Sequence, residues 1–328
     1  MAAAQIQGDA AQQIKTVNCA MKTPIVIFCR MAALCILTAA AACAPLSKTQ
    51  MEAVQKLAFR SDTVSRSPAV LFRQMSEIRT ERGLFYAASL SSGQMRYEEV
   101  TALAEASMDE ESMVRKAEGY VDVLNSYVRA LHSVSSPQRW KGAGTQLRGI
   151  GSRVDSVLYR YNRLDTGYED IPTGYAKMAG RVLAYVAEEV MQTTQAVAVR
   201  NIVIAADTLV AAGCDSLMDI LRSEEMNALI EHEKESVGDN YSAYLRAMEL
   251  SGIVVPLESD RQYVALVRRA EELSRIRNSC VSALRSLKNA HARLAADFVS
   301  GDKDISGELM DELVRFNRLA SQVAGYID

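Results

Sequence analysis

The sequence predicts an all-α protein, an elongated antiparallel helical bundle with long helices. Apolar residues after Cys43 recur at alternating steps of three and four, which places them on one face of a helix. No segment alternates apolar and polar residues at every second position for long, so no sheet is expected. The composition agrees with this prediction, because aromatic residues, which favour strands, make up only 6% of the chain.

The clearest apolar stripe lies near the C-terminus and continues through nine steps. Two of its positions are polar, Arg277 and His291. A polar residue in an apolar seam more often fixes register or oligomeric state than performs chemistry. We therefore interpret Arg277 and His291 as core polar residues that set register. The whole stripe consists of Leu266, Ala270, Leu273, Arg277, Cys280, Leu284, Leu287, His291, Leu294 and Phe298.

Stretches rich in Ser, Gly and Pro divide the stripes and predict about nine helices. The longest of these helices are expected over 175–212, 214–249 and 259–299, each roughly 55–60 Å long. The polar stretch 165–174 can divide the body into two sub-bundles, 49–164 and 175–328. The other predicted breaks are Ser67-Pro68, Ser91 to Gly93, Ser135 to Pro137, Gly213, Ser251 to Ser259 and Ser300 to Asp302.

The N-terminal segment has the layout of a signal peptide. Lys22 and Arg30 precede an apolar stretch, 31–42, that is too short to span a bilayer. Residues 1–20 are polar and lie before a better start at Met21, so we expect a mis-called start. Residues 1–42 are therefore predicted to be a leader that exports the rest of the chain.

The apolar run ends in Ala40-Ala41-Ala42-Cys43, which resembles the cleavage site of bacterial lipoprotein precursors. In that family the chain is cut before the cysteine, here between Ala42 and Cys43, and the cysteine carries the lipid. Residues 43–48 then look like the polar tether that follows such cysteines. Ala44 is similar to the residue found in lipoproteins of the outer membrane, which implies a lipid-anchored envelope protein that faces the periplasm.

Lipid attachment would hold the body at the membrane, because each buried methylene contributes about 0.8 kcal/mol and the anchor has two or three acyl chains. Two alternatives remain open. The chain can be secreted after cleavage near the same alanines, or it can keep an uncleaved N-terminal anchor. All three routes export the body.

The remaining residues give no support for an enzyme, a cofactor or a metal site. His132, His232 and His291 lack the spacing of zinc proteases and di-iron bundles. The charged stretch 231–235 around His232 is interpreted as a solvated helix face. The glycines between 142 and 151 match no phosphate-binding motif. Cys214 and Cys280 are expected about 20 Å apart, too far for a disulfide.

The net charge of −3 offers no basic surplus for phosphates, so nucleic acid is not an expected partner. We expect a non-enzymatic scaffold or interaction module that is anchored through its lipid and contacts another envelope protein or a second copy of itself. One alternative is a membrane-active, pore-forming helical protein that inserts 196–212, because this stretch is apolar nearly all round. A second alternative is a carrier that holds a small ligand in a pocket between helices.

Overall fold

The computed structural model describes residues 46–105, 112–138, 140, 173–301 and 304–326. These residues form eight helices and no strand, which confirms the all-α prediction. Contacts divide the chain after Pro45, and every described helix belongs to the unit Leu46–Asp328. The helices are α2 (Lys48–Ser89), α3 (Gly93–Glu105), α4 (Ser112–Ser135), α6 (Thr173–Gln192), α7 (Gln195–Arg222), α8 (Glu224–Leu250), α9 (Leu257–Ser300) and α10 (Gly307–Ala324).

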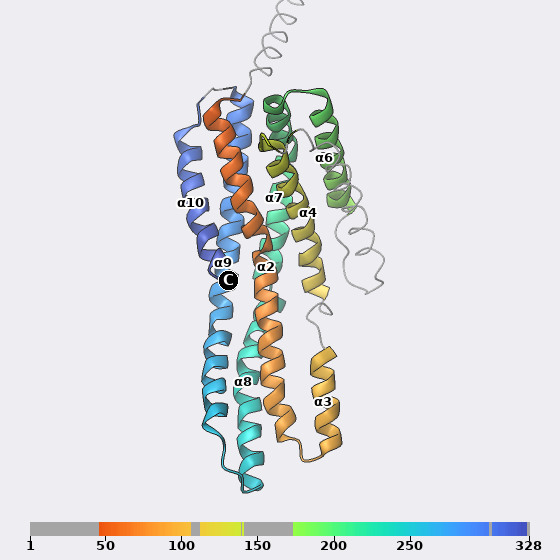
Figure 1. Cartoon of the computed structure of the whole chain (residues 1–328), viewed down its shortest axis with the longest axis vertical. Helices are drawn as coiled ribbons and strands as arrows, with labels where there is room; N and C mark the ends of the chain where they lie inside the picture. The colour runs from red at the N-terminus through yellow and green to blue at the C-terminus, as the bar shows by residue number, and fades with distance from the viewer. Residues whose placement is uncertain (1–45, 106–111, 139, 141–172, 302–303, 327–328) are drawn as a thin grey trace, which may run out of the picture. The chain divides into compact units, whose positions relative to one another are not determined.

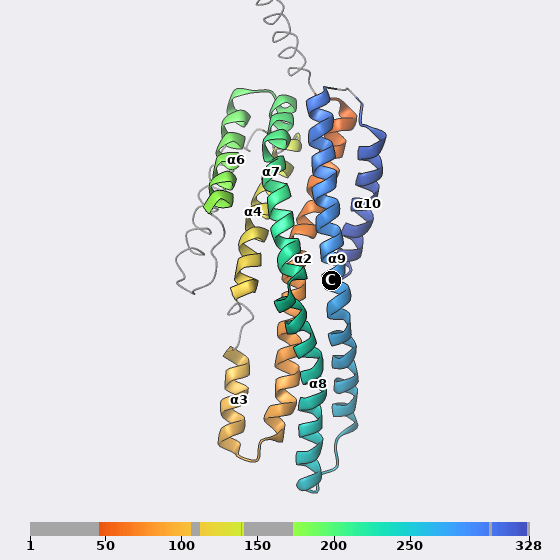
Figure 2. The same ribbon diagram turned by 180° about the vertical axis from the view of Figure 1, so that it is seen from behind.

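Two helices, α2 and α9, run along most of this unit in opposite directions (Figures 1 and 2). They contain 42 and 44 residues, so each is roughly 65 Å long. Helices α7 and α8 follow one another along the same direction; α7 packs against α9, and α8 packs against both α2 and α9. Helices α4, α6 and α10 pack around the half that contains α7, whereas α3 contacts α2 in the other half.

The predicted apolar stripes form the core of the unit. A second apolar stripe of the sequence lies in α4, and its residues Val114, Ala117, Val121, Leu124, Val128 and Leu131 are all buried. The apolar members of the stripe in α9 are buried as well. One continuous cluster of buried side chains includes residues from every described helix except α3. Helices on both sides of the predicted boundary 165–174 share this cluster, since α2 contacts α8, α9 and α10. The boundary itself lies mostly outside the described residues.

The predicted break at Ser67-Pro68 is wrong, because Pro68 lies inside α2. Proline has no N–H to donate to the carbonyl four residues earlier, here that of Val64. The hydroxyl of Ser67 donates to the same carbonyl over 2.7 Å. A neighbouring side chain thus replaces the hydrogen bond that proline removes, and the helix continues.

The predicted break at Gly213 is also wrong, because α7 continues to Arg222 and ends at Ser223. Ser223 closes α7 and begins α8, where its hydroxyl accepts a hydrogen bond from the N–H of Met226. Glu224 and Glu225 add negative charge to the first turn of α8, which favours a helix start. The helix expected over 175–212 is likewise two helices, which separate at Thr193-Thr194.

Gly213 has a packing role in place of the expected break. A Cβ at this position would contact the Tyr175 hydroxyl and lie 3.0 Å from a Leu124 methyl group. Tyr175 is buried, and its hydroxyl has no hydrogen-bond partner in the described part of the chain. The glycine therefore provides the space in which α6 and α4 approach α7.

We expect Gly213→Ala to lower the free energy of unfolding by about 1–2 kcal/mol, because overpacking outweighs the gain in helix propensity. In a Tyr175→Phe background, which removes the contacted hydroxyl, at least half of this loss should disappear. Urea unfolding of the two single variants and the double variant measures both effects. An equal loss in both backgrounds would show that the hydroxyl is not the obstacle.

Candidate functional site

The structure places the two predicted register residues in different environments. His291 is buried in α9, and its Nε2 lies 2.7 Å from the Tyr127 hydroxyl of α4. Its Nδ1 lies 3.0 Å from a carboxylate oxygen of Asp207 in α7. Burial and the nearby Asp207 carboxylate raise the pKa of Tyr127 well above its usual value of 10. Tyr127 therefore keeps its proton and donates to Nε2, while Nδ1 donates to Asp207.

The order Asp207, His291, Tyr127 resembles the acid, base and nucleophile of a hydrolase. A buried tyrosine that retains its proton is a poor nucleophile, however. The three side chains instead join α4, α7 and α9 through two hydrogen bonds. This position agrees with a structural role for His291.

Arg277 is not a core residue, so the sequence interpretation is wrong at this position. Its side chain is half-buried and donates to Asn227 of α8, and the neighbouring Ile276 is buried in the core. The strict alternation of three and four has a period of 3.5, whereas an α-helix has 3.6 residues per turn, so the two drift apart by about 20° per heptad. The buried face of α9 therefore passes from Leu273 to Ile276 and then to Cys280.

The interpretation of 231–235 as a solvated face is wrong at Glu233, which is completely buried. One carboxylate oxygen of Glu233 accepts from Nε of Arg79 over 2.8 Å, and the other accepts from Nε of Arg82 over 2.6 Å. Both arginines belong to α2. A buried carboxylate needs such partners, because an unpaired charge in the core is strongly unfavourable. Glu233 lies three residues after Ile230 and four before Val237, so the alternation of three and four places it on the buried face of α8.

We expect Glu233→Gln to lower the free energy of unfolding by about 2–4 kcal/mol, because two partly buried guanidinium groups lose their counter-charge. The matched control is Glu231→Gln on the same helix, where the side chain is 60% exposed and a loss below about 0.5 kcal/mol is expected. Thermal and urea unfolding measure both variants. Equal losses would contradict the assignment of Glu233 as a buried link between α2 and α8.

Helix α7 contains the stretch 196–212. By length and composition it is the one described helix that could cross a membrane, with a mean hydropathy of 1.6 over its most apolar window. It is also a packed helix of the bundle, in contact with α4, α6 and α9. Arg200 is buried, and its Nε and Nη2 donate to the Phe298 carbonyl over 3.0 and 2.7 Å. This carbonyl is one of those that the end of α9 leaves without an intrahelical partner.

The described cysteines, Cys214 and Cys280, are free and buried. Burial raises the pKa of Cys214 to about 12 and that of Cys280 to about 11, so both thiols stay protonated at neutral pH. Within the described ranges, no group of three or more His, Cys, Asp and Glu residues could hold a metal ion. The predicted cleavage and lipidation residues, Ala42 and Cys43, and the glycines between 142 and 151 lie outside those ranges.

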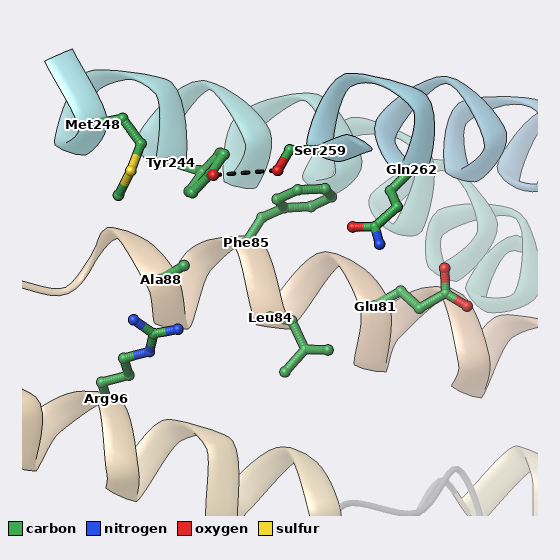
Figure 3. Close-up of a pocket in the computed structure, with 9 residues that line it drawn as sticks. All are labelled: Glu81, Leu84, Phe85, Ala88, Arg96, Tyr244, Met248, Ser259 and Gln262. Carbon is green, nitrogen blue, oxygen red and sulfur yellow. Dashed lines mark hydrogen bonds between the residues drawn. The ribbon is translucent and has the colours of Figure 1, made fainter. Parts of the chain in front are cut away.

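A groove of about 650 Å³ lies at the end of the unit where α2 and α8 finish and α3 and α9 begin (Figure 3). Apolar side chains from α2 and α8 line much of it, and Arg96 of α3 lies at the side opposite Glu81 and Gln262. The lining residues are Glu81, Leu84, Phe85, Ala88, Arg96, Tyr244, Met248, Ser259 and Gln262.

Aromatic packing gives one wall of this groove a fixed position. The Phe85 ring lies 5.0 Å from the Tyr241 ring and 5.5 Å from the Tyr244 ring. Tyr241 stacks on Tyr263 at 4.1 Å and also hydrogen-bonds Asp260. The Tyr244 and Ser259 hydroxyl oxygens are 3.2 Å apart. These contacts hold the ends of α2, α8 and α9 together beneath the groove.

The same end of the unit carries most of the exposed large apolar side chains. Eleven of the fifteen in the described residues belong to 84–100 and 245–264, and we call these two segments the apolar end. Four of them lie at or beside the turn between α8 and α9 and are 54–90% exposed. They are Leu250, Ile253, Val254 and Leu257. This surface was not predicted from the sequence, although the aliphatic run within the predicted break 251–259 is a signal for it.

No model of a known protein family, no curated protein and no solved structure matches this chain.

Proposed function

We propose that this protein is a non-enzymatic interaction module of the bacterial cell envelope, anchored by a lipid on Cys43, and that another envelope protein binds its apolar end. The observation that carries the proposal is the turn between α8 and α9, where four aliphatic side chains face solvent. Full burial of each such side chain contributes about 1.5–3 kcal/mol. An apolar surface of this kind is typical of a binding site.

The arrangement of the helices supports an anchor at one end and a partner at the other. Residue 46, three residues after Cys43, lies at the beginning of α2, and the turn between α8 and α9 lies at the opposite end of the same unit (Figure 1). The 44 residues of α9 cover roughly 65 Å between these ends. A lipid on Cys43 would therefore leave the apolar end free to meet a partner.

The shape of the turn favours a different protein over a second copy. Figures 1 and 2 show that the turn extends beyond the neighbouring turn between α2 and α3. A projecting apolar tip is buried best by a concave apolar surface, which a second projecting tip does not offer. The alternative function, insertion of 196–212, requires α7 to leave its contacts and to bring Arg200 and Asp207 into lipid, which costs several kcal/mol. We therefore favour the interaction function.

The anchor is tested by Cys43→Ala. We expect the parent chain to incorporate labelled palmitate and to fractionate with membranes, and the variant to lose both properties, because the cysteine sulfur is the only site of attachment proposed. Measurement is by metabolic labelling and fractionation of cells. Membrane fractionation of both forms without label in either would contradict the lipid anchor.

The partner surface is tested by in-cell photo-crosslinking from a reactive residue placed at Ser251. We expect one protein species to be captured reproducibly. Capture should fall at least about fivefold in the double variant Leu250→Ser and Val254→Ser, which removes two side chains that the partner would bury. The control is Val299→Ser with Val314→Ser, two residues exposed to 66% and 63% outside the apolar end.

The control variant should capture as much partner as the parent chain. Equal capture by both double variants would contradict binding at the apolar end, and capture of this chain alone would contradict a separate partner. Melting temperatures of the purified variants establish that all of them are folded.

A further inference from the structure

We propose that the groove at the apolar end binds a small amphipathic monoanion, an unbranched apolar chain that ends in a carboxylate, with the carboxylate on Arg96. The chain of the ligand would lie along Leu84, Ala88 and Met248, which line the groove beside Arg96 (Figure 3). The groove belongs to the apolar end, but none of the four aliphatic side chains at the turn between α8 and α9 lines it, and its test uses no partner protein.

Arg96 supplies the positive charge that a carboxylate would contact. A guanidinium is a planar cation whose donors form a fork that matches two carboxylate oxygens. Among the described residues no side chain pairs with it. The nearby Glu98 accepts instead from the amide of Gln94, over 2.7 Å. The groove therefore contains a cation whose hydrogen-bond donors are available to a ligand.

The other polar groups of the groove are mostly engaged, which limits the ligand to one charge. Tyr244 and Ser259 contact each other, and Glu81 accepts from Nη1 of Arg269 over 2.5 Å. Glu81 lies on the side of the groove away from Arg96, so it would repel a second anionic group there. Gln262 is the other lining residue without a partner in the described part of the chain. An apolar chain needs no further hydrogen-bond donor or acceptor in the groove.

The size of the groove favours a small ligand over a helix of a partner protein. Small-molecule sites have volumes of roughly 300–1,000 Å³ and are lined by apolar and aromatic side chains with a few polar groups. The volume here, about 650 Å³, lies in that range. A helix about 10 Å wide fills roughly 400 Å³ with each 5.4 Å turn, so the groove has room for little more than one turn. Helices that bind in grooves use anchors spread over two turns or more.

Dodecanoate is the probe, and isothermal titration calorimetry of the purified full chain is the measurement. We expect saturable binding with a Kd of roughly 10–100 µM, in the range of ligand efficiency for a chain of this size. Dodecan-1-ol, which has the same chain without the charge, should bind at least about fivefold more weakly, because it forms no charge-assisted hydrogen bond.

The variant Arg96→Gln tests whether Arg96 binds the carboxylate of dodecanoate. It should weaken dodecanoate binding about five- to tenfold and leave dodecan-1-ol binding unchanged. Arg246→Gln is the matched control, since Arg246 is exposed near the end of α8 and does not line the groove, and it should bind both probes as the parent does. Ala88→Phe, which fills the groove, should weaken both probes.

Three results would overturn the proposal. They are no saturable binding of dodecanoate up to about 1 mM, equal affinity for acid and alcohol in the parent chain, and equal weakening by Arg96→Gln and Arg246→Gln. Any of these would show that the groove does not recognise an apolar chain through a carboxylate on Arg96. Because crosslinking at the tip is measured separately, failure of dodecanoate binding leaves the proposed function standing.

Discussion

The fold depends on the burial of apolar faces that are longer than any one neighbour of α2 and α9 can cover. These two helices contain 42 and 44 residues, and their buried residues extend over most of that length. An isolated helix is marginal in water, so each stretch of apolar face needs a neighbour. Helices α7 and α8 cover α9 one after the other, whereas α8 covers α2 in one half and α4 and α10 cover it in the other. Ser223 gives the chain a break between α7 and α8 that satisfies both helix ends. The bundle therefore consists of long helices with shorter ones packed around them.

Within this apolar framework, a few buried polar groups specify which helices meet. Glu233 joins α8 to α2, His291 joins α9 to α4 and α7, and Arg200 joins α7 to the end of α9. Each buried group is favourable only when its partners lie in register, since an unsatisfied polar group in the core costs about 1–3 kcal/mol and a charge costs more. A shift of one helix by a turn would leave these groups without partners. Apolar burial thus supplies most of the stabilisation, and the polar links select one register.

The periodicity of the sequence predicted the helices and most of the core, because the spacing of apolar residues is a local property of the chain. The stripe in α4 is buried at every predicted position, and the stripe in α9 departs only at Arg277. The predictions of helix breaks at Pro68 and Gly213 were wrong, because the residue type alone does not show the contacts that allow the helix to continue. The Ser67 hydroxyl supplies a missing hydrogen bond, and Tyr175 occupies the space that Gly213 leaves. The groove was not predictable, since tertiary packing alone brings Arg96 and Met248 to line the same groove.

The taper of the bundle explains part of the exposed apolar surface, and the remainder points to function. At the apolar end α2 has α3, α8 and α9 as neighbours, whereas α4 and α10 pack against it in the other half. Fewer covering helices account for half-exposed residues on helix faces, such as Leu84 and Val264. Fewer covering helices do not account for Leu250 and Val254, which are 89% and 90% exposed in and beside a turn. Polar residues at these two positions would not lower the stability of the fold. Aliphatic side chains at such positions add no stability to this chain alone, which is the reason for proposing that a partner contacts them.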